Sequence, residues 1–169
     1  MSYPLARHFG VGITEVDDFQ VLLETLTTPE QFPALHYWKT HPEAAEEPAE
    51  RILERTLKVA RVLAPGVRAV IDNHLDEQMP VVLEGDFLLP ELHGANSDRV
   101  RAVFLYEPEE RQIVENFLQR EPEAGPQTKR ARVSWLYGQW LKDEAGARGL
   151  SALPARPWET LFGRVLAAL

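Results

Sequence analysis

Short apolar runs alternate with longer stretches of helical spacing along this chain. Residues 11–16 (VGITEV) alternate in polarity and contain several β-branched side chains, which predicts a strand. Three further apolar runs have the length of short strands, and the run at 80–83 is typical of a strand buried on both faces. The predicted strands cover residues 11–16, 80–83, 101–106 and 149–153.

Helices are predicted between these strands, where apolar residues recur every three or four positions. Between Ala49 and Ala64 this spacing is regular, and Pro65 followed by Gly66 is expected to end the helix. Residues 121–128 (EPEAGPQT) predict a loop. The predicted helices are a helix tail at 5–8 that stops at Gly10, segments 19–26, 49–64, 67–78 and 129–147, and helices opening at Pro108 and Pro157.

The alternation of strands and helices favours the α/β class, with a parallel sheet covered by helices on both faces. A length of 169 residues suits one domain, so residues 1–169 are expected to fold together. With 18 basic and 26 acidic residues the formal net charge is −8, which argues against general nucleic-acid binding. The chain has no cysteine, which excludes disulfides, thiolate metal sites and cysteine nucleophiles.

The sequence contains no sign of a membrane segment or an export signal. No apolar run approaches the roughly 20 residues that span a bilayer. Residues 1–7 (MSYPLAR) lack the apolar core of a signal peptide. We therefore expect a cytoplasmic protein without a membrane partner.

Acidic residues follow two of the predicted strands. Asp17 and Asp18 come after the first strand, and Glu84 and Asp86 come after the second. Ligands of open parallel sheets bind beyond the carboxyl ends of the strands, so these side chains are expected along one rim. Such a rim can hold Mg²⁺ or take a proton from an attacking hydroxyl group. The alternative is that the acids only form turns and cap helices.

Basic residues gather around the predicted loop in an otherwise acidic chain. Planar guanidinium groups suit phosphate oxygens, and a loop with glycine and proline between two helices could close over a phosphorylated ligand. The alternative is an ordinary solvated surface. The basic lid predicted here spans residues 120–132 and contains Arg120, Lys129, Arg130 and Arg132.

The order of these motifs resembles that of P-loop small-molecule kinases. Residues 17–19 (DDF) are similar to a turn of uridine kinase-like enzymes. Residues 82–90 (VLEGDFLLP) resemble a strand and its following loop in the 2-phosphoglycerate kinase-like group. The family has a histidine where this chain has Asp86, which leaves the acceptor substrate open.

The resemblance implies roles for the acidic and basic residues, together with ATP and Mg²⁺ as cofactors. Asp17 or Asp18 would bind or deprotonate the hydroxyl group of the acceptor. Glu84 and Asp86 would lie near the magnesium ion and the substrate. The basic lid would cover the phosphates of the nucleotide.

One motif of that superfamily is missing from these residues, namely G-x-x-x-x-G-K-S/T, which binds triphosphate after the first strand. The lysines of the chain, at 39, 58, 129 and 142, do not follow glycine. Residues 3–10 (YPLARHFG) are similar to the tail of the family's first helix, so the first strand and the phosphate loop are expected to be absent. The sheet would then lack a strand between those near Leu83 and Phe104. Three alternatives remain: these two strands pair directly, another chain fills the gap, or the sequence belongs to a longer protein.

The resemblance predicts an ATP-dependent phosphotransferase that acts on a small molecule, with impaired nucleotide binding in this chain. The alternative is a non-catalytic kinase-like remnant that binds a phosphorylated ligand or another protein. A third hypothesis is a structural α/β domain without a site. The sequence leaves both a monomer and a homodimer open.

Overall fold

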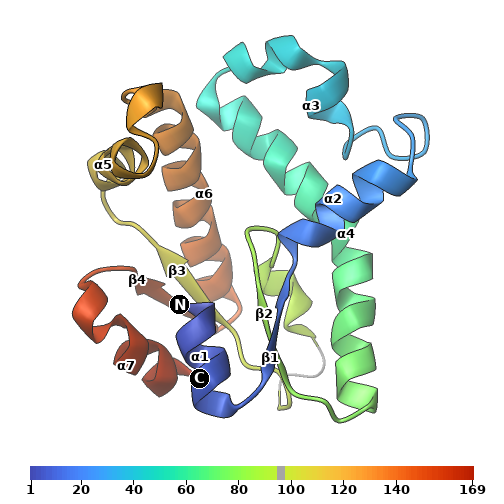
Figure 1. Ribbon diagram of the computed structural model, residues 1–169, viewed down its shortest axis with the longest axis vertical. Helices are drawn as coiled ribbons and strands as arrows, with labels where there is room; N and C mark the ends of the chain where they lie inside the picture. The colour runs from blue at the N-terminus through green and yellow to red at the C-terminus, as the bar shows by residue number, and fades with distance from the viewer. Residues whose placement is uncertain (95–97) are drawn as a thin grey trace. The chain divides into compact units, whose positions relative to one another are not determined.

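The computed structural model describes residues 1–94 and 98–169, and Figure 1 labels the helices and strands. Chain length predicts one domain, and the structure divides these residues into two compact units. Unit 1 contains Met1–Glu46 and Glu54–Arg99, and unit 2 contains Glu47–Leu53 and Val100–Leu169. None of the helices described has both the length and the apolar composition that crossing a bilayer requires.

Unit 1 is built on two parallel strands, β1 (Gly12–Glu15) and β2 (Val81–Glu84). Glu15 pairs with Glu84, so the two strands end at the same level. The predicted stop of the first helix at Gly10 is confirmed, because Gly10 adopts a left-handed conformation with a φ angle of 67°. The other elements of unit 1 are α1 (Ser2–Phe9), α2 (Asp17–Leu26), α3 (Tyr37–Thr40), η1 (Pro42–Glu46), most of α4 (Ala49–Asp76) and η2 (Pro90–Leu92).

Helix α4 is one continuous helix of 28 residues, so the break predicted at Pro65 is wrong. A proline inside a helix removes one backbone hydrogen bond and favours a kink. The apolar face around it is nevertheless buried, since Leu63 is 1% exposed and Val67 is 0% exposed. Packing of that face offsets the lost hydrogen bond, because most helix stability in proteins comes from tertiary contacts.

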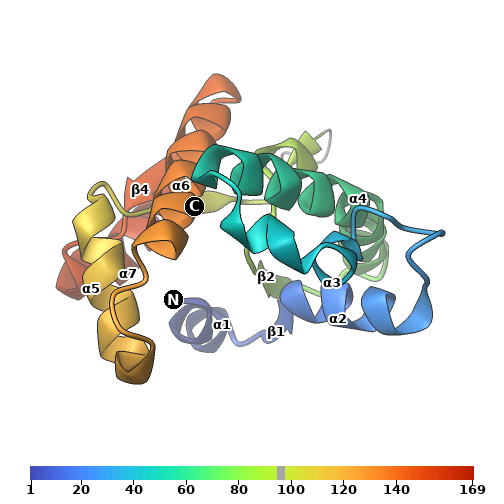
Figure 2. The same ribbon diagram turned by 90° about the horizontal axis from the view of Figure 1, so that it is seen from above.

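The core of unit 1 joins the segment before α3 to helices α2 and α4. Figure 2 shows α3 between these two helices. One cluster of this core consists of Leu35, Val59 and Leu63, with Leu23 and Phe87 packed against them. Phe87 directly follows Asp86, so the core anchors the loop that leaves β2.

Unit 2 also contains a parallel pair, β3 (Val103–Tyr106) and β4 (Ser151–Pro154). A Cβ atom at Gly138 would lie 3.4 Å from Cβ of Tyr106, so glycine allows its helix to approach β3 closely. Trp135 Nε1 donates a 2.9 Å hydrogen bond to the Pro108 carbonyl. Pro108 lies before α5 (Glu110–Arg120) and not in its first turn as predicted. The helices are α5 (Glu110–Arg120), η4 (Pro122–Ala124), α6 (Thr128–Ala147) and α7 (Trp158–Ala168).

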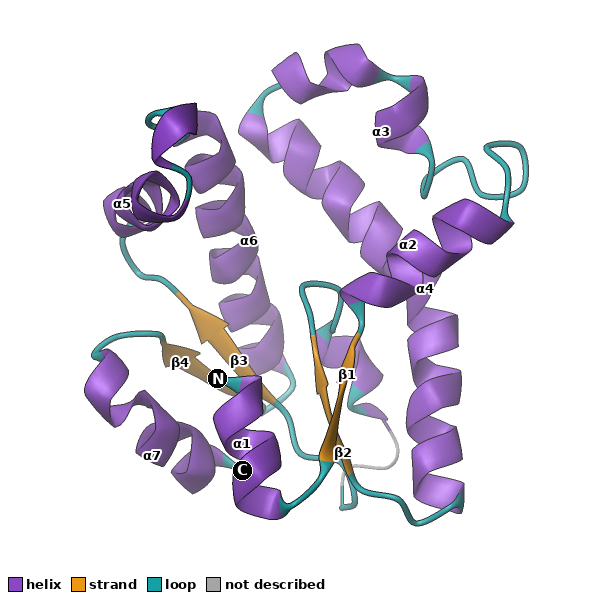
Figure 3. Cartoon of the chain, in the orientation of Figure 1, coloured by secondary structure: helices purple, strands orange, loops and turns teal. Residues whose placement is uncertain are grey.

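The described strands form two separate two-stranded sheets instead of the single sheet predicted (Figure 3). The α/β class and the parallel direction of both pairs are confirmed. Within the described residues, β2 and β3 belong to different sheets, so direct pairing near Leu83 and Phe104 is wrong. Each pair is instead joined by its own helical crossover, which returns the chain to the neighbouring parallel strand.

Candidate functional site

The carboxyl ends of β1 and β2 carry the acidic rim, a name used here for Asp17, Asp18, Glu84 and Asp86. Val16 N donates a 2.7 Å hydrogen bond to the Glu84 carbonyl, so strand pairing continues up to the start of α2. Figure 3 shows β1 running directly into α2. This local geometry brings the four predicted acids to one edge of unit 1.

Asp17 and Asp86 are in direct contact across the rim. The Asp86 N–H donates a 3.0 Å hydrogen bond to Oδ1 of Asp17. Gly85 makes this approach possible, because its φ angle is 144° and an added Cβ would lie 2.7 Å from the same Oδ1 atom. Gly85 thereby leaves room for the Asp86 N–H to orient the Asp17 carboxylate.

The carboxylates of the rim disfavour one another's charge. The pKa of Asp17 is raised, first by partial burial and next by the negative charge of Asp86, while the hydrogen bond from Asp86 N opposes the shift. Glu84 and Asp18 add to the repulsion. The pKa of Asp86 is also raised, by partial loss of hydration and by Glu84. Binding of a proton or a cation therefore lowers the free energy of the rim.

Ser2 joins the rim, although the sequence analysis did not select it. Its hydroxyl group donates a 2.7 Å hydrogen bond to Oε2 of Glu84, and the residue is 8% exposed. The two residues are separated by 82 positions, so no local pattern links them. This bond orients the Glu84 side chain at the end of β2.

The predicted metal ligands Glu84 and Asp86 lie together at the rim, and their metal-binding role stays a prediction. Across residues 1–94 and 98–169, no group of three or more His, Asp or Glu side chains is arranged to hold a metal ion alone. Mg²⁺ is commonly held by one or two carboxylates, with waters and substrate oxygens completing its coordination. The donor set at the rim fits that mode rather than a cage made of protein ligands.

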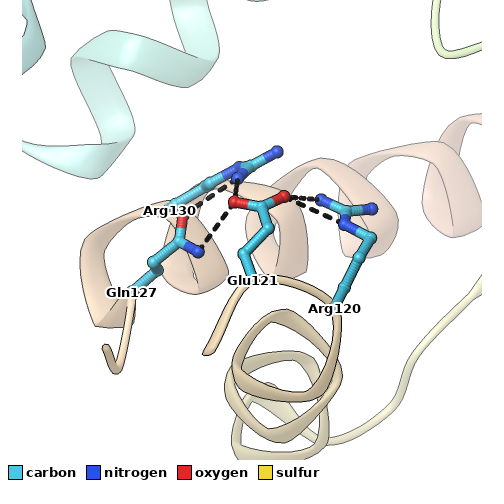
Figure 4. A network of polar contacts seen from close by, with 4 residues as sticks. All are labelled: Arg120, Glu121, Gln127 and Arg130. Atoms are coloured by element: carbon cyan, nitrogen blue, oxygen red, sulfur yellow. Dashed lines mark hydrogen bonds and ion pairs between the residues drawn. The ribbon is translucent and has the colours of Figure 1, made fainter. Parts of the chain in front are cut away.

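The basic lid contains a cluster of polar contacts centred on Glu121 (Figure 4). Arg120 donates to Oε1 of Glu121 from Nε at 3.0 Å and from Nη2 at 2.8 Å. Arg130 Nη1 and Gln127 Nε2 donate to Oε2 at 2.8 and 3.0 Å. These bonds lower the pKa of Glu121 to about 2. The bond from Gln127 has the largest effect and the bond from Arg120 the next largest.

The third arginine of the lid is also paired with acids. Arg132 Nη1 donates a 3.0 Å hydrogen bond to Oε2 of Glu110, and Nη2 lies 3.6 Å from Oε1 of Glu50. Its guanidinium carbon lies 4.8 Å from the centre of the Trp135 ring. Lys129 is exposed in the first turn of α6. The three lid arginines are thus engaged by carboxylates of unit 2, and their contact with nucleotide phosphates stays a prediction.

Comparisons with known proteins leave the family open. No family model matches the chain, and neither a curated protein nor a solved structure matches it. The likeness to P-loop kinases therefore depends on short sequence motifs and stays a prediction. The geometry itself defines an α/β protein with an acidic edge on one parallel strand pair.

Proposed function

We propose that the acidic rim is the acceptor-binding part of a phosphotransferase-type site that uses ATP and Mg²⁺. The observation that supports this proposal is the contact of Asp17 with Asp86 at the ends of two parallel strands, where both carboxyl pKa values are raised. A raised pKa makes a carboxylate a better proton acceptor near neutral pH. The rim lies at the carboxyl ends of the strands, where ligands of open parallel sheets generally bind.

Asp17 is the proton acceptor in this proposal. Its carboxylate takes the proton of an acceptor hydroxyl group as the hydroxyl oxygen bonds to the transferred phosphorus atom and the bond to the leaving phosphate breaks. The hydrogen bond from Asp86 N holds Oδ1 of Asp17 and so orients the group. Glu84 and Asp86 would hold Mg²⁺, which when bound neutralises charge on the phosphoryl oxygens. For the basic lid of unit 2 we propose, separately from the rim, contact with phosphate groups.

A non-catalytic phospho-ligand or interaction module is the second candidate. It is favoured by the carboxylate partners of Arg120, Arg130 and Arg132, and by the missing G-x-x-x-x-G-K-S/T motif in the 169 residues. That motif supplies much of the phosphate contact in P-loop enzymes through backbone N–H groups and a lysine. This candidate predicts that MgATP does not stabilise the chain.

The test combines thermal melting with an assay of ADP release over a panel of small alcohols and sugars. We expect MgATP to raise the melting temperature, though by less than a complete phosphate loop would allow, since a ligand stabilises the state that binds it. Asp17→Asn should lower phosphoryl transfer about a hundredfold or more. Glu43→Gln removes one exposed carboxylate elsewhere in unit 1 and should leave transfer unchanged.

Two outcomes contradict the proposal. Melting of the wild-type chain that ignores MgATP and MgCl₂ favours the non-catalytic candidate. The same assay on a version extended by the codons upstream of Met1 then decides whether a preceding segment restores ATP binding. Equal activity of the wild type and Asp17→Asn would remove Asp17 as the proton acceptor.

A further inference from the structure

The network around Glu121 has the geometry of an occupied oxyanion site. Four hydrogen bonds from three side chains end on one carboxylate. Two of the donors are guanidinium groups, which bind carboxylate and phosphate oxygens in the same planar arrangement. Figure 4 shows the two arginines approaching Glu121 from opposite sides.

The arginines are positioned by more than their ion pairs with Glu121. The guanidinium carbon of Arg130 lies 4.4 Å from the centre of the Phe117 ring, and that of Arg120 lies 5.1 Å from it. A guanidinium group over an aromatic ring gains cation–π attraction. Gln127 also accepts a 2.9 Å hydrogen bond from Arg130. The donor set is therefore partly ordered by contacts that do not involve the Glu121 carboxylate.

Glu121 itself is held mainly by these polar contacts. Its side chain is 36% exposed, and those of Arg120 and Arg130 are 59% and 49% exposed. Exposed ion pairs contribute little net stability, because the charges remain well solvated. An anion from solution can therefore compete with Glu121 for the same donors, and an anion with more charge competes better.

We infer that Glu121 is an internal competitor that occupies an oxyanion site formed by Arg120, Gln127 and Arg130. A ligand with a phosphate or pyrophosphate group binds there by displacing the Glu121 carboxylate. The side chain then sets a threshold for binding, since a weakly charged anion does not displace it. This inference rests on the proposed phosphate contact of the basic lid, but it requires no phosphoryl transfer.

The test is calorimetric titration of the whole chain with inorganic pyrophosphate, at low salt and without metal ions. Glu121→Gln keeps the shape of the side chain and removes its charge, so we expect pyrophosphate affinity to rise at least about fivefold. Glu123→Gln is the matched control, because it removes the same charge from an exposed residue two positions away. Its affinity should stay within about twofold of the wild type.

Further variants identify the donors. Arg130→Gln, made in the Glu121→Gln chain, should abolish the gain in pyrophosphate affinity. Glu121→Ala provides a second removal of the carboxylate, and circular dichroism with thermal melting checks that every variant is folded.

Three results would overturn the inference. Equal gains in pyrophosphate affinity in Glu121→Gln and Glu123→Gln would show an effect of net charge only. Weaker or unchanged pyrophosphate binding in both Glu121 variants, or no pyrophosphate binding in any folded variant, would also overturn it. The failure of this test is distinct from failure of the proposed function, since the MgATP and Asp17→Asn assays address the acidic rim in unit 1.

Discussion

Acidic side chains have opposite surroundings in the two units. In unit 1, Asp17 and Asp86 lie among other carboxylates, and both pKa values are raised. In unit 2, Glu121 accepts hydrogen bonds from two arginines and a glutamine, and its pKa is lowered to about 2. One region keeps negative charge that a ligand could neutralise, and the other neutralises its charge internally.

The two regions are also held in different ways. The acidic rim is attached to the core of unit 1 through Phe87, which follows Asp86, and its close contact depends on Gly85. The Glu121 network is partly exposed, like the rim, and is held by its own polar contacts and by the Phe117 ring. A backbone anchored in the core can hold carboxylates that repel one another, whereas a cluster without such an anchor has to be electrostatically favourable to persist.

The largest expected effect tests the support beneath the rim. Leu63 is 1% exposed in the core that also holds Phe87, so Leu63→Ala should lower the free energy of unfolding by about 3 kcal/mol. Leu26 is 70% exposed, and Leu26→Ala should cost less than about 0.5 kcal/mol. Urea unfolding of both variants measures the difference. Similar values would show that Leu63 is not packed in the core that holds Phe87.

The next effect concerns the contact between the two strand ends. Gly85→Ala places a Cβ atom 2.7 Å from Asp17 Oδ1 at a φ angle of 144°, and should cost about 2–3 kcal/mol. Gly10→Ala is the control, because its φ angle is 67° and no atom lies within 4 Å of the added Cβ; it should cost about 1 kcal/mol. A cost for Gly85→Ala no larger than that of the control would contradict the close approach.

A smaller effect of opposite sign is expected from removing one charge of the rim. The folded pKa of Asp86 is raised, so ionisation costs stability once the pH exceeds its ordinary value of 3.8. Asp86→Asn should therefore raise the melting temperature at pH 7, and the gain should vanish below about pH 3. Asp143→Asn, at an exposed position of α6, is the control. A destabilised Asp86→Asn chain at pH 7 would show that ionised Asp86 does not cost stability.

The smallest effect is expected at Glu121. Its lowered pKa means that ionised Glu121 stabilises the fold above pH 4.5, and this contribution is lost as the pH falls towards about 2. Glu121→Gln should slightly lower the melting temperature at pH 7 and have no effect near pH 2. Glu123→Gln serves as the control. The opposite pH dependence of Asp86→Asn and Glu121→Gln is the sharpest test of the contrast between the units.

The acidic rim could be predicted because it depends on local rules. Acids that directly follow two strands meet when those strands are parallel neighbours, as β1 and β2 are. The order of strands and helices follows from apolar spacing in the same way. The observed strand ends differ from the predicted ones by no more than two residues. They differ because helix caps and turns are set by backbone contacts that apolar spacing does not encode.

Other features depend on distant contacts and could not be predicted. The bond from Ser2 to Glu84 joins residues 82 positions apart. The continuation of α4 through Pro65 depends on burial of the helix face, which outweighs the local preference of proline. The pairing of Arg120 and Arg130 with Glu121 depends on how the loop turns between α5 and α6. Composition alone indicates positive charge there, not its internal neutralisation.

Helix α4 has a practical consequence for dissecting the molecule. Its first residues, Ala49–Leu53, belong to unit 2, while its remainder belongs to unit 1. An expression fragment starting at Val100 would therefore lack Glu50, whose carboxylate lies 3.6 Å from Arg132. Because the units are interleaved along the chain, isolating either one as a stable piece calls for a rearranged gene that splices its separate stretches, and not for simple truncation.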